Sequence, residues 1–279
     1  MTKIIAAFDG LKFSDSTKEF AVSVARQTKA HLVGIFLEDL TYHSYKIYEL
    51  VTEKGVSETK LKQYEATDEE AREKAIKKFE TACREAGITC SVHHDRKIAI
   101  KELLHESIYA DLLIIDAKET LTHYDETKPT RFTRELLAEV QCPVLLVPQK
   151  YKPIEKNLLL YDGEPSSVFA IRMFGYVLPE LKILPCEVVS VKYMNNNLHV
   201  PDNKLIKEFM KRHFPKATYT TLKGLPEIEI VNHLKEQKEN TLIVLGAYRR
   251  SMVSRWFRSS MADVLMKETK FPLFIAHNK

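Results

Sequence analysis

Two similar stretches of sequence decide the fold. "KIIAAFDGLKFS" (3–14) and "KNLLLYDGEPSS" (156–167) each begin with lysine and continue with an apolar run. Each run then ends in Asp-Gly, with a serine a few residues later. A short apolar run bounded by turn residues is typical of a buried β-strand. The chain therefore starts the same predicted strand-and-turn unit twice.

Further matches follow these two stretches in the same order. "ADLLIIDA" (110–117) matches "NTLIVLGA" (240–247), and "VQCPVLLVP" (140–148) matches "TKFPLFIAH" (269–277). Three matches in one order, in both halves of the chain, indicate an internal repeat.

A seam separates the two copies. The segment "PQKYKPIEK" (148–156) contains two prolines and several charged residues, which interrupt the apolar pattern. We therefore expect two domains, covering residues 1–150 and 151–279.

Each half alternates apolar runs with segments of helical periodicity, which predicts an α/β fold with parallel strands covered by helices on both faces. Right-handed crossovers make each half a doubly wound, Rossmann-like domain. The expected strands are 3–9, 31–37, 88–94, 111–116 and 143–148, then 157–162, 186–193, 217–222, 241–246 and 272–277. The expected helices are 13–29, 98–105 and 132–140, then 166–178, 203–213, 227–235 and 260–267.

The first half carries an insertion between its second and third strands, at 38–87. The charged stretch 58–85 has acids and lysines four residues apart, which predicts a long helix with a narrow apolar face formed by Ala75, Phe79 and Ala82. This helix is either a solvated cover over the sheet or an arm for a partner. Three tyrosines ahead of it either pack against helices or form an interface; they are Tyr42, Tyr45 and Tyr48.

Composition indicates a globular protein that works in a reducing compartment. The 279 residues are 44% hydrophobic and 29% charged, with a net charge of +4. Such a small charge does not argue for a nucleic-acid partner, and no apolar run is long enough for a membrane span. Cys83, Cys90, Cys142 and Cys186 lack metal-binding spacing and are expected as buried thiols. We expect a cytoplasmic protein with neither nucleic acid nor membrane as a partner.

One loop suggests a function. "GAYRRSMVSRWFRSSMADVL" (246–265) resembles the nucleotide loop of the universal stress protein family, whose pattern is G-x2-G-x9-G-[ST]. Without a gap, the four pattern positions are Gly246, Arg249, Ser259 and Ser260. The resemblance covers nearly the whole chain as a tandem of two domains. It implies a strand order of 3-2-1-4-5 in each domain.

The resemblance also implies a ligand site in the second half, with ATP as a possible ligand and neither another cofactor nor a metal. Asp162 would lie near the nucleoside, and Val191 would offer backbone groups to adenine. The phosphates would be held by the loop positions Gly246, Arg249, Ser259 and Ser260. Arg249 and Ser259 stand where the family has its second and third glycines. Arginine guanidinium groups would therefore replace backbone N–H groups as hydrogen-bond donors to the phosphates.

Two alternatives remain open in this loop. Its arginines form either a phosphate site or a solvated basic surface. Ser260 and Asp263 have the spacing of a helix N-cap, so Ser260 either caps a helix, contacts a ligand, or does both. The Asp-Gly pairs after the first strand of each half also have a simple structural explanation, as turns.

The corresponding loop of the first half is acidic. Its sequence, "DAKETLTHYDETKPTRFTREL", places Asp116 and Glu119 at the first two glycine positions, and we align Thr130 with the third glycine and Arg131 with the hydroxyl residue. Carboxylates repel phosphate. We therefore expect a degenerate site that does not bind nucleotide.

A non-catalytic protein that binds or senses a nucleotide is the leading hypothesis, because no acid, base and nucleophile come together in the sequence. The alternatives are a nucleotide hydrolase or transferase, for which Asp162 would be the base, and an interaction protein without a ligand. The apolar fifth strands, 143–148 and 272–277, need cover. The family resemblance also implies that domains pair through this strand, so we expect the fifth strands to join the halves as an intramolecular pseudo-dimer, with homodimerisation possible.

Overall fold

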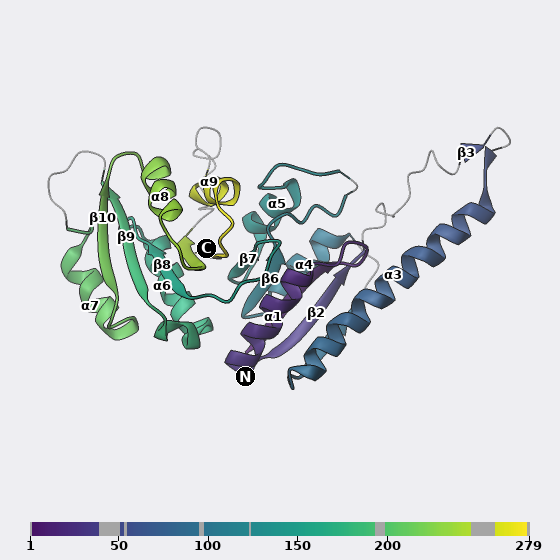
Figure 1. Cartoon of the computed structure of the whole chain (residues 1–279), viewed down its shortest axis with the longest axis horizontal. Helices are drawn as coiled ribbons and strands as arrows, with labels where there is room; N and C mark the ends of the chain where they lie inside the picture. The colour runs from purple at the N-terminus through teal and green to yellow at the C-terminus, as the bar shows by residue number, and fades with distance from the viewer. Residues whose placement is uncertain are drawn as a thin grey trace.

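The chain forms one continuous sheet of ten strands with helices on both faces (Figure 1). The order of the strands is β10-β9-β8-β11-β12-β7-β6-β1-β2-β5. Each half of this sheet has the order 3-2-1-4-5 when its main strands are numbered along the chain, as expected. The computed structural model describes residues 2–38, 51–52, 55–94, 98–122, 124–192, 199–246 and 260–277.

The first half contains five parallel strands and the helices between them. The strands are β1 (Lys3–Asp9), β2 (His31–Leu37), β5 (Cys90–His93), β6 (Leu112–Asp116) and β7 (Val144–Val147). The helices are α1 (Asp15–Thr28), α3 (Glu58–Glu85), α4 (Ala99–Ser107) and α5 (Arg131–Glu139). A small hairpin of β3 (Val51–Thr52) and β4 (Gly55–Val56) precedes α3 and was not expected.

The second half repeats this plan. Its strands are β8 (Lys156–Leu160), β9 (Cys186–Lys192), β10 (Thr218–Lys223), β11 (Thr241–Gly246) and β12 (Leu273–Ala276). Its helices are α6 (Pro165–Val177), α7 (Asn203–His213), α8 (Pro226–Lys235) and α9 (Met261–Glu268), with the 3-10 helix η1 (Pro179–Ile183) after α6.

The two halves are joined through their fifth strands. β7 and β12 pair antiparallel, with Leu145 opposite Phe274. The prediction of a pseudo-dimer formed by these two apolar strands is therefore confirmed. Pairing gives each strand the hydrogen-bonding neighbour that it would lack at the edge of a five-stranded sheet. Figure 1 places α5 and α9 on the same side of this junction.

Two apolar cores cover the two faces of the sheet, and each of them runs through both halves. Alternate residues of one strand enter different cores, as the pleat of a strand requires. In β1, for example, Ile4 and Phe8 belong to one core and Ile5 to the other. A sheet buried on both faces explains why its central strands are almost wholly apolar.

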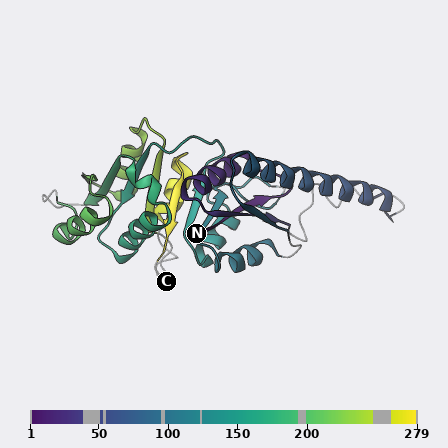
Figure 2. The same ribbon diagram turned by 90° about the horizontal axis from the view of Figure 1, so that it is seen from below.

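The long helix α3 is anchored by its C-terminal half, while its first turns extend away from the sheet (Figures 1 and 2). A Cβ on Gly34 of β2 would lie 2.7 Å from Cε1 of Phe79, so glycine makes room for that ring. The buried apolar stripe is Ala75, Phe79 and Cys83, spaced four residues apart. Ala82, the third residue of the expected apolar face, is partly buried.

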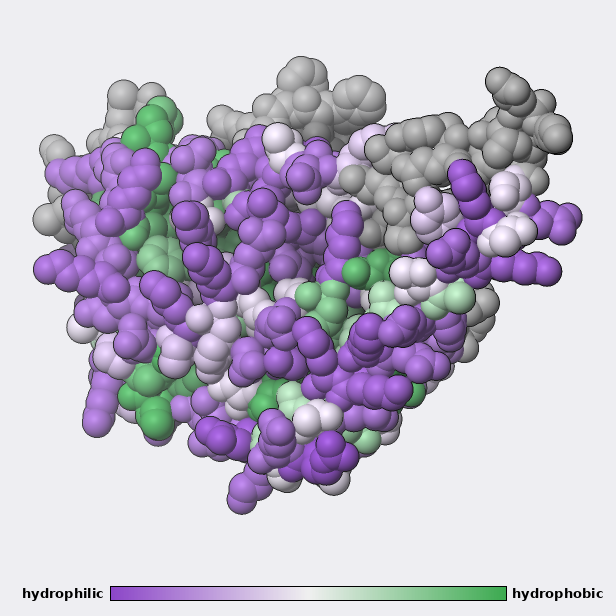
Figure 3. Space-filling model, turned by 45° about the vertical axis from the view of Figure 1, so that its right-hand side comes forward, coloured by the Kyte–Doolittle hydropathy of each residue, from purple (hydrophilic) through white to green (hydrophobic). Residues whose placement is uncertain are grey.

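Figure 3 shows the side of the molecule that carries α3, and this surface is mostly hydrophilic. Among the described residues, no helix has both the length and the apolar character that a membrane span requires.

Three of the four cysteines are buried as expected, but Cys90 is partly exposed on strand β5. Tyr42, Tyr45 and Tyr48 lie outside the described residues.

Candidate functional site

The carboxyl ends of β8 and β9 bring two of the predicted site residues to the same level of the sheet. Register between these strands runs to the pair Leu160–Val189. Asp162 and Val191 each lie two residues further along the chain, at the edge where doubly wound proteins bind ligands. Val191 is partly buried and pairs with Leu222 of β10, whereas Asp162 is exposed.

Asp162 organises the turn into α6. Its Oδ1 atom accepts hydrogen bonds from the backbone N–H of Glu164 (2.9 Å) and from Oγ of Ser167 (2.7 Å). Asp9 has the corresponding place in the first half, and its Oδ1 accepts from the N–H groups of Leu11 (2.7 Å) and Lys12 (3.1 Å). The two aspartates therefore share a structural role in the turn after the first strand.

Gly246, the last residue of β11, lies directly against the start of α6. A Cβ at this position would be 2.5 Å from the carbonyl oxygen of Ser166, closer than real Cβ atoms approach. Only glycine allows this approach without movement of the backbone. The predicted positions Asp162, Val191 and Gly246 thus all belong to the carboxyl edge of the second half.

Ser260 is the N-cap of α9. Its Oγ accepts a hydrogen bond from the N–H of Ala262 (3.3 Å), and its carbonyl oxygen accepts from the N–H of Asp263 (2.8 Å). The capping role is therefore confirmed. Arg249 and Ser259 lie outside the described residues.

The first-half loop requires one correction to the predicted alignment. Thr130 is the N-cap of α5, and its Oγ1 accepts from the N–H of Thr133 (3.1 Å). It therefore corresponds to Ser260 as the hydroxyl residue, and Arg131 is the first residue of the helix. Our alignment, which placed Thr130 at the third glycine and Arg131 at the hydroxyl position, was one residue too late in the chain.

Carboxylates occupy the corresponding edge of the first half. Asp116, at the position of Gly246, accepts from Oγ of Ser14 (3.0 Å) and from the N–H of Lys118 (2.8 Å). Glu119 is buried and accepts from the N–H groups of the two residues that follow it. Burial raises the pKa of Glu119 to about 8, and the charges of Asp9 and Asp116 act in the same direction.

Helix α3 also covers this edge of the first half. The Arg72 side chain lies over the turn after β1, because a Cβ on Gly10 would be 3.0 Å from its Cγ atom. Nε of Arg72 lies 3.3 Å from Oε1 of Glu38, and His94 also contacts that carboxylate. Glu38 and Arg72 are buried, whereas the His94 side chain is 31% exposed. The three residues come from α3 and from the ends of β2 and β5.

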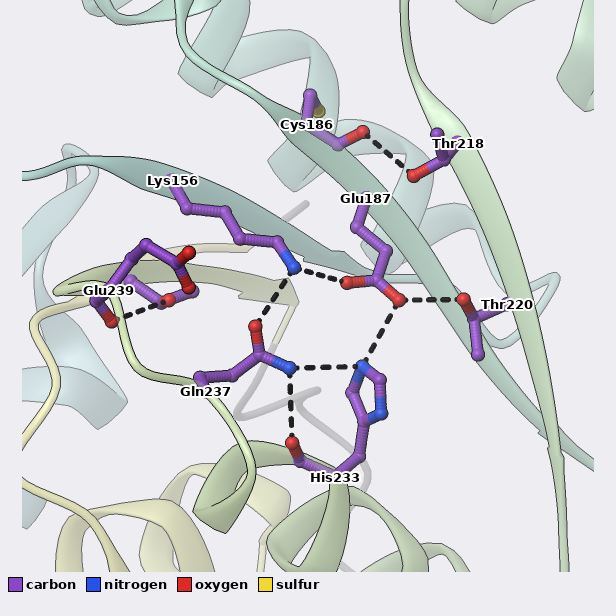
Figure 4. A network of polar contacts seen from close by, with 9 residues as sticks. Lys156, Cys186, Glu187, Thr218, Thr220, His233, Gln237 and Glu239 are labelled. Atoms are coloured by element: carbon purple, nitrogen blue, oxygen red, sulfur yellow. Dashed lines mark hydrogen bonds and ion pairs between the residues drawn. The ribbon is translucent and has the colours of Figure 1, made fainter.

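A different polar network lies at the opposite, amino edge of the second half (Figure 4). The buried Glu187 accepts from Nζ of Lys156 (2.7 Å) and Oγ1 of Thr220 (2.6 Å), and it lies 3.1 Å from Nε2 of His233. Nζ of Lys156 also donates to Oε1 of Gln237 (2.8 Å). Burial acts to raise the pKa of Glu187, but the bonds from Lys156 and Thr220 outweigh it, so the pKa lies below its usual value. This network ties the end of α8 to the sheet.

The adjacent histidines at the end of β5, His93 and His94, do not share a site. Nδ1 of His93 lies 2.6 Å from Oε1 of Glu106, whereas His94 contacts Glu38. Neighbouring residues along a strand point to opposite faces, which separates the two side chains. Within the described parts of the chain, no group of three or more His, Cys, Asp or Glu residues could hold a metal ion.

Comparison with known proteins identifies the fold. No protein-family model matches the sequence, and a comparison with curated protein sequences also gives no match. A universal stress protein from Archaeoglobus fulgidus DSM 4304 superimposes with a TM-score of 0.72 at 12% identity, over 99% of this chain and 98% of that one. A protein of unknown function from Pseudomonas aeruginosa PAO1 superimposes with a TM-score of 0.61 at 14% identity, over 99% and 92%.

The chain is thus a doubly wound α/β protein built as two joined halves. Its fold is that of full-length structures of universal stress proteins. A universal stress protein in complex with cAMP matches 46% of this chain at 16% identity, with a TM-score of 0.37. The nucleotide in that complex is a property of that protein.

Proposed function

We propose that the chain is a non-catalytic stress-response protein of the universal stress type, with domains at 1–150 and 151–279. Its second domain binds a nucleotide such as ATP or AMP, or another phosphate-bearing ligand, and the protein acts in the cytoplasm. The ligand residues are those of the predicted carboxyl-edge site: Asp162, Val191, Gly246, Arg249, Ser259 and Ser260.

The single observation that carries this proposal is the close approach of Gly246 to Ser166. This contact places the end of β11 against the first turn of α6, where backbone N–H groups and the helix dipole favour an anion. No acidic side chain stands at the end of β11, in contrast to Asp116 at the end of β6. The second half is therefore the better suited of the two to accept phosphate.

The first domain is proposed to bind no nucleotide. Its carboxyl edge holds Asp9 and Asp116, whose charges would repel a phosphate. The side chain of Arg72 lies over the neighbouring turn and is engaged with Glu38. A nucleotide would have to displace this buried ion pair, which is costly.

Isothermal titration calorimetry tests the proposal, with ATP, ADP, AMP and cyclic nucleotides added to the purified chain. We expect one site per chain, and binding that is lost in Asp162→Ala and in Arg249→Ala. Asp125→Ala in the first-half loop is the control and should bind as the parent does. Turnover of ATP under these conditions would support the hydrolase hypothesis instead, and the absence of binding to any nucleotide would support a ligand-free interaction protein.

A further inference from the structure

Three strongly exposed apolar side chains lie on helices of the second half. Ile183 is 85% exposed, Leu205 67% and Tyr176 61%, and each belongs to a described helix. Single exposed apolar residues are common, but several together on one surface indicate an interaction site.

Ring contacts place Tyr176 beside helix α7. Tyr176 of α6 lies 5.6 Å from the ring of His213 of α7, which stacks at 4.2 Å on Phe209. Leu205 is one helical turn before Phe209 on the same helix. Helices α6 and α7 lie beside each other in Figures 1 and 2.

The same surface is strongly basic. Arg172 of α6 lies 5.9 Å from the Phe209 ring, and Lys182 of η1 lies 5.4 Å from the Phe214 ring. Burial lowers the pKa of His213, and the positive charges of Lys182 and Arg172 lower it further. Among the described residues, neither of these two cations forms an ion pair.

Charge on these elements is asymmetric. Residues 165–183 and 203–216 contain seven lysines and arginines against two glutamates, whereas the net charge of the whole chain is only +4. These elements therefore carry an excess of positive charge, which the rest of the chain does not on balance. We call the surface formed by Arg172, Tyr176, Lys182, Ile183, Leu205 and Arg212 the α6–α7 face.

We propose that the α6–α7 face binds the surface of an anionic lipid membrane. Lysine and arginine side chains would contact the lipid headgroups, while Ile183, Leu205 and Tyr176 would enter the interface between headgroups and acyl chains. The exposed aliphatic side chains favour a lipid surface over a nucleic acid, because isoleucine and leucine offer no plane on which bases could stack. Such peripheral binding requires no membrane-spanning helix, and it revises our expectation that the protein has no membrane partner.

Vesicle co-sedimentation of the full chain tests this proposal. We expect binding to vesicles of phosphatidylcholine mixed with phosphatidylglycerol, little binding to phosphatidylcholine alone, and release as salt is raised. The triple variant Arg172→Gln, Lys182→Gln, Arg212→Gln should weaken binding about tenfold or more, because each cation near an anionic surface contributes.

A matched charge control uses exposed lysines of α3. Lys62→Gln, Lys74→Gln and Lys77→Gln together lower the net charge by the same amount on a different surface. This variant should keep most of the vesicle binding. Equal losses in the two triple variants would mean that only net charge matters, and would overturn the assignment to this face.

The apolar contribution has its own matched pair. Ile183→Ser should weaken binding to the anionic vesicles roughly fivefold, since a side chain that enters the interface is lost. Ile108→Ser, at a residue of the first half that is 56% exposed, should leave binding unchanged. The proposal fails if the chain does not sediment with anionic vesicles, or if Ile183→Ser binds like the parent. It also fails if the triple variant at this face instead loses binding to a single-stranded oligonucleotide.

Discussion

The carboxyl edges of the two halves use the same scaffold in opposite ways. In the first half, Asp116 ends β6 and bonds Ser14 at the start of α1. In the second half, Gly246 ends β11 and lets the backbone touch Ser166 at the start of α6. The strand order is the same in both, so the fold tolerates either solution. Chemistry at this edge is therefore free to differ between the halves.

The amino edges differ in another way. In each half, a lysine of the first strand contacts a glutamate, which in turn contacts a histidine. In the first half the glutamate lies on a helix and the histidine on a strand, whereas in the second half the glutamate lies on a strand and the histidine on a helix. Glu106 and His233 hold the same position in α4 and α8, counted from the N-caps Ile98 and Leu225. The two sets are Lys3, Glu106 and His93, and Lys156, Glu187 and His233.

The largest effect is expected from Glu187→Ala. This substitution leaves Lys156 and His233 without their shared carboxylate in a largely buried place, and should lower the free energy of unfolding by about 2–4 kcal/mol. Glu106→Ala removes the more exposed counterpart and should cost only about 1 kcal/mol or less. Urea unfolding followed by circular dichroism measures both. Equal costs would contradict the difference in burial between the two networks.

Gly246→Ala should have the next largest effect. The new methyl group would collide with the Ser166 carbonyl, so the free energy of unfolding should fall by about 1–3 kcal/mol. Gly175→Ala in α6 is the control, because there a Cβ makes an ordinary 3.4 Å contact with the Phe214 ring. An alanine within a helix should be neutral, or stabilising by about 0.5–1 kcal/mol. The same result for both variants would mean that the contact at Gly246 is not tight.

Glu119→Gln should change how stability depends on pH. The pKa of Glu119 is about 8 in the folded chain and 4.5 for the ordinary group. Between these two values the folded state keeps a proton that the unfolded state releases, so stability falls as pH rises through this window. Glutamine removes this dependence, so the variant should gain thermal stability over the parent as the pH is raised.

Thermal unfolding at several pH values measures that gain. Glu65→Gln, on the exposed part of α3, is the control and should follow the parent curve. A Glu119→Gln variant that loses stability relative to the parent as pH rises would show that the carboxylate is charged and stabilised in the folded state.

The smallest effects are expected at the helix caps. Thr130→Ala and Ser260→Ala each remove an N-cap, and each should cost about 1 kcal/mol. Arg131→Ala should cost almost nothing, since its side chain is exposed at the first position of the helix. Chemical denaturation of the three variants tests the corrected alignment of the loops. If Arg131→Ala lowers the free energy of unfolding more than Thr130→Ala does, the original alignment, with Arg131 at the hydroxyl position, would be correct.

Most of the fold could be predicted from the sequence, because the apolar strands and the repeat are strong local signals. The bounds of α3, α7 and β11 agree with the predicted segments 58–85, 203–213 and 241–246. The pairing of β7 with β12 followed from the family resemblance together with the need to cover two apolar edges. The hairpin of β3 and β4 was missed, because strands of two residues leave no periodicity to detect.

The candidate site was less accessible to sequence reasoning. The loop pattern located Gly246, but its contact with Ser166 depends on how two elements pack. Engagement of Arg72 with Glu38 was also missed, because these residues are far apart in the chain and look like two members of a solvated charged segment. A clue was present in the pattern, since Arg72 lies on the same face of its helix as Ala75 and Phe79.

Hydrogen exchange measured by mass spectrometry, with and without ATP, tests the central claim most directly, because it reports on both halves in one experiment. The proposal predicts slower exchange on ATP binding in 157–167, 186–192 and 241–262. It predicts no change in 3–14 or 112–131. Protection of the first-half segments, or of neither set at saturating ATP, would contradict the assignment of the ligand site to the second half.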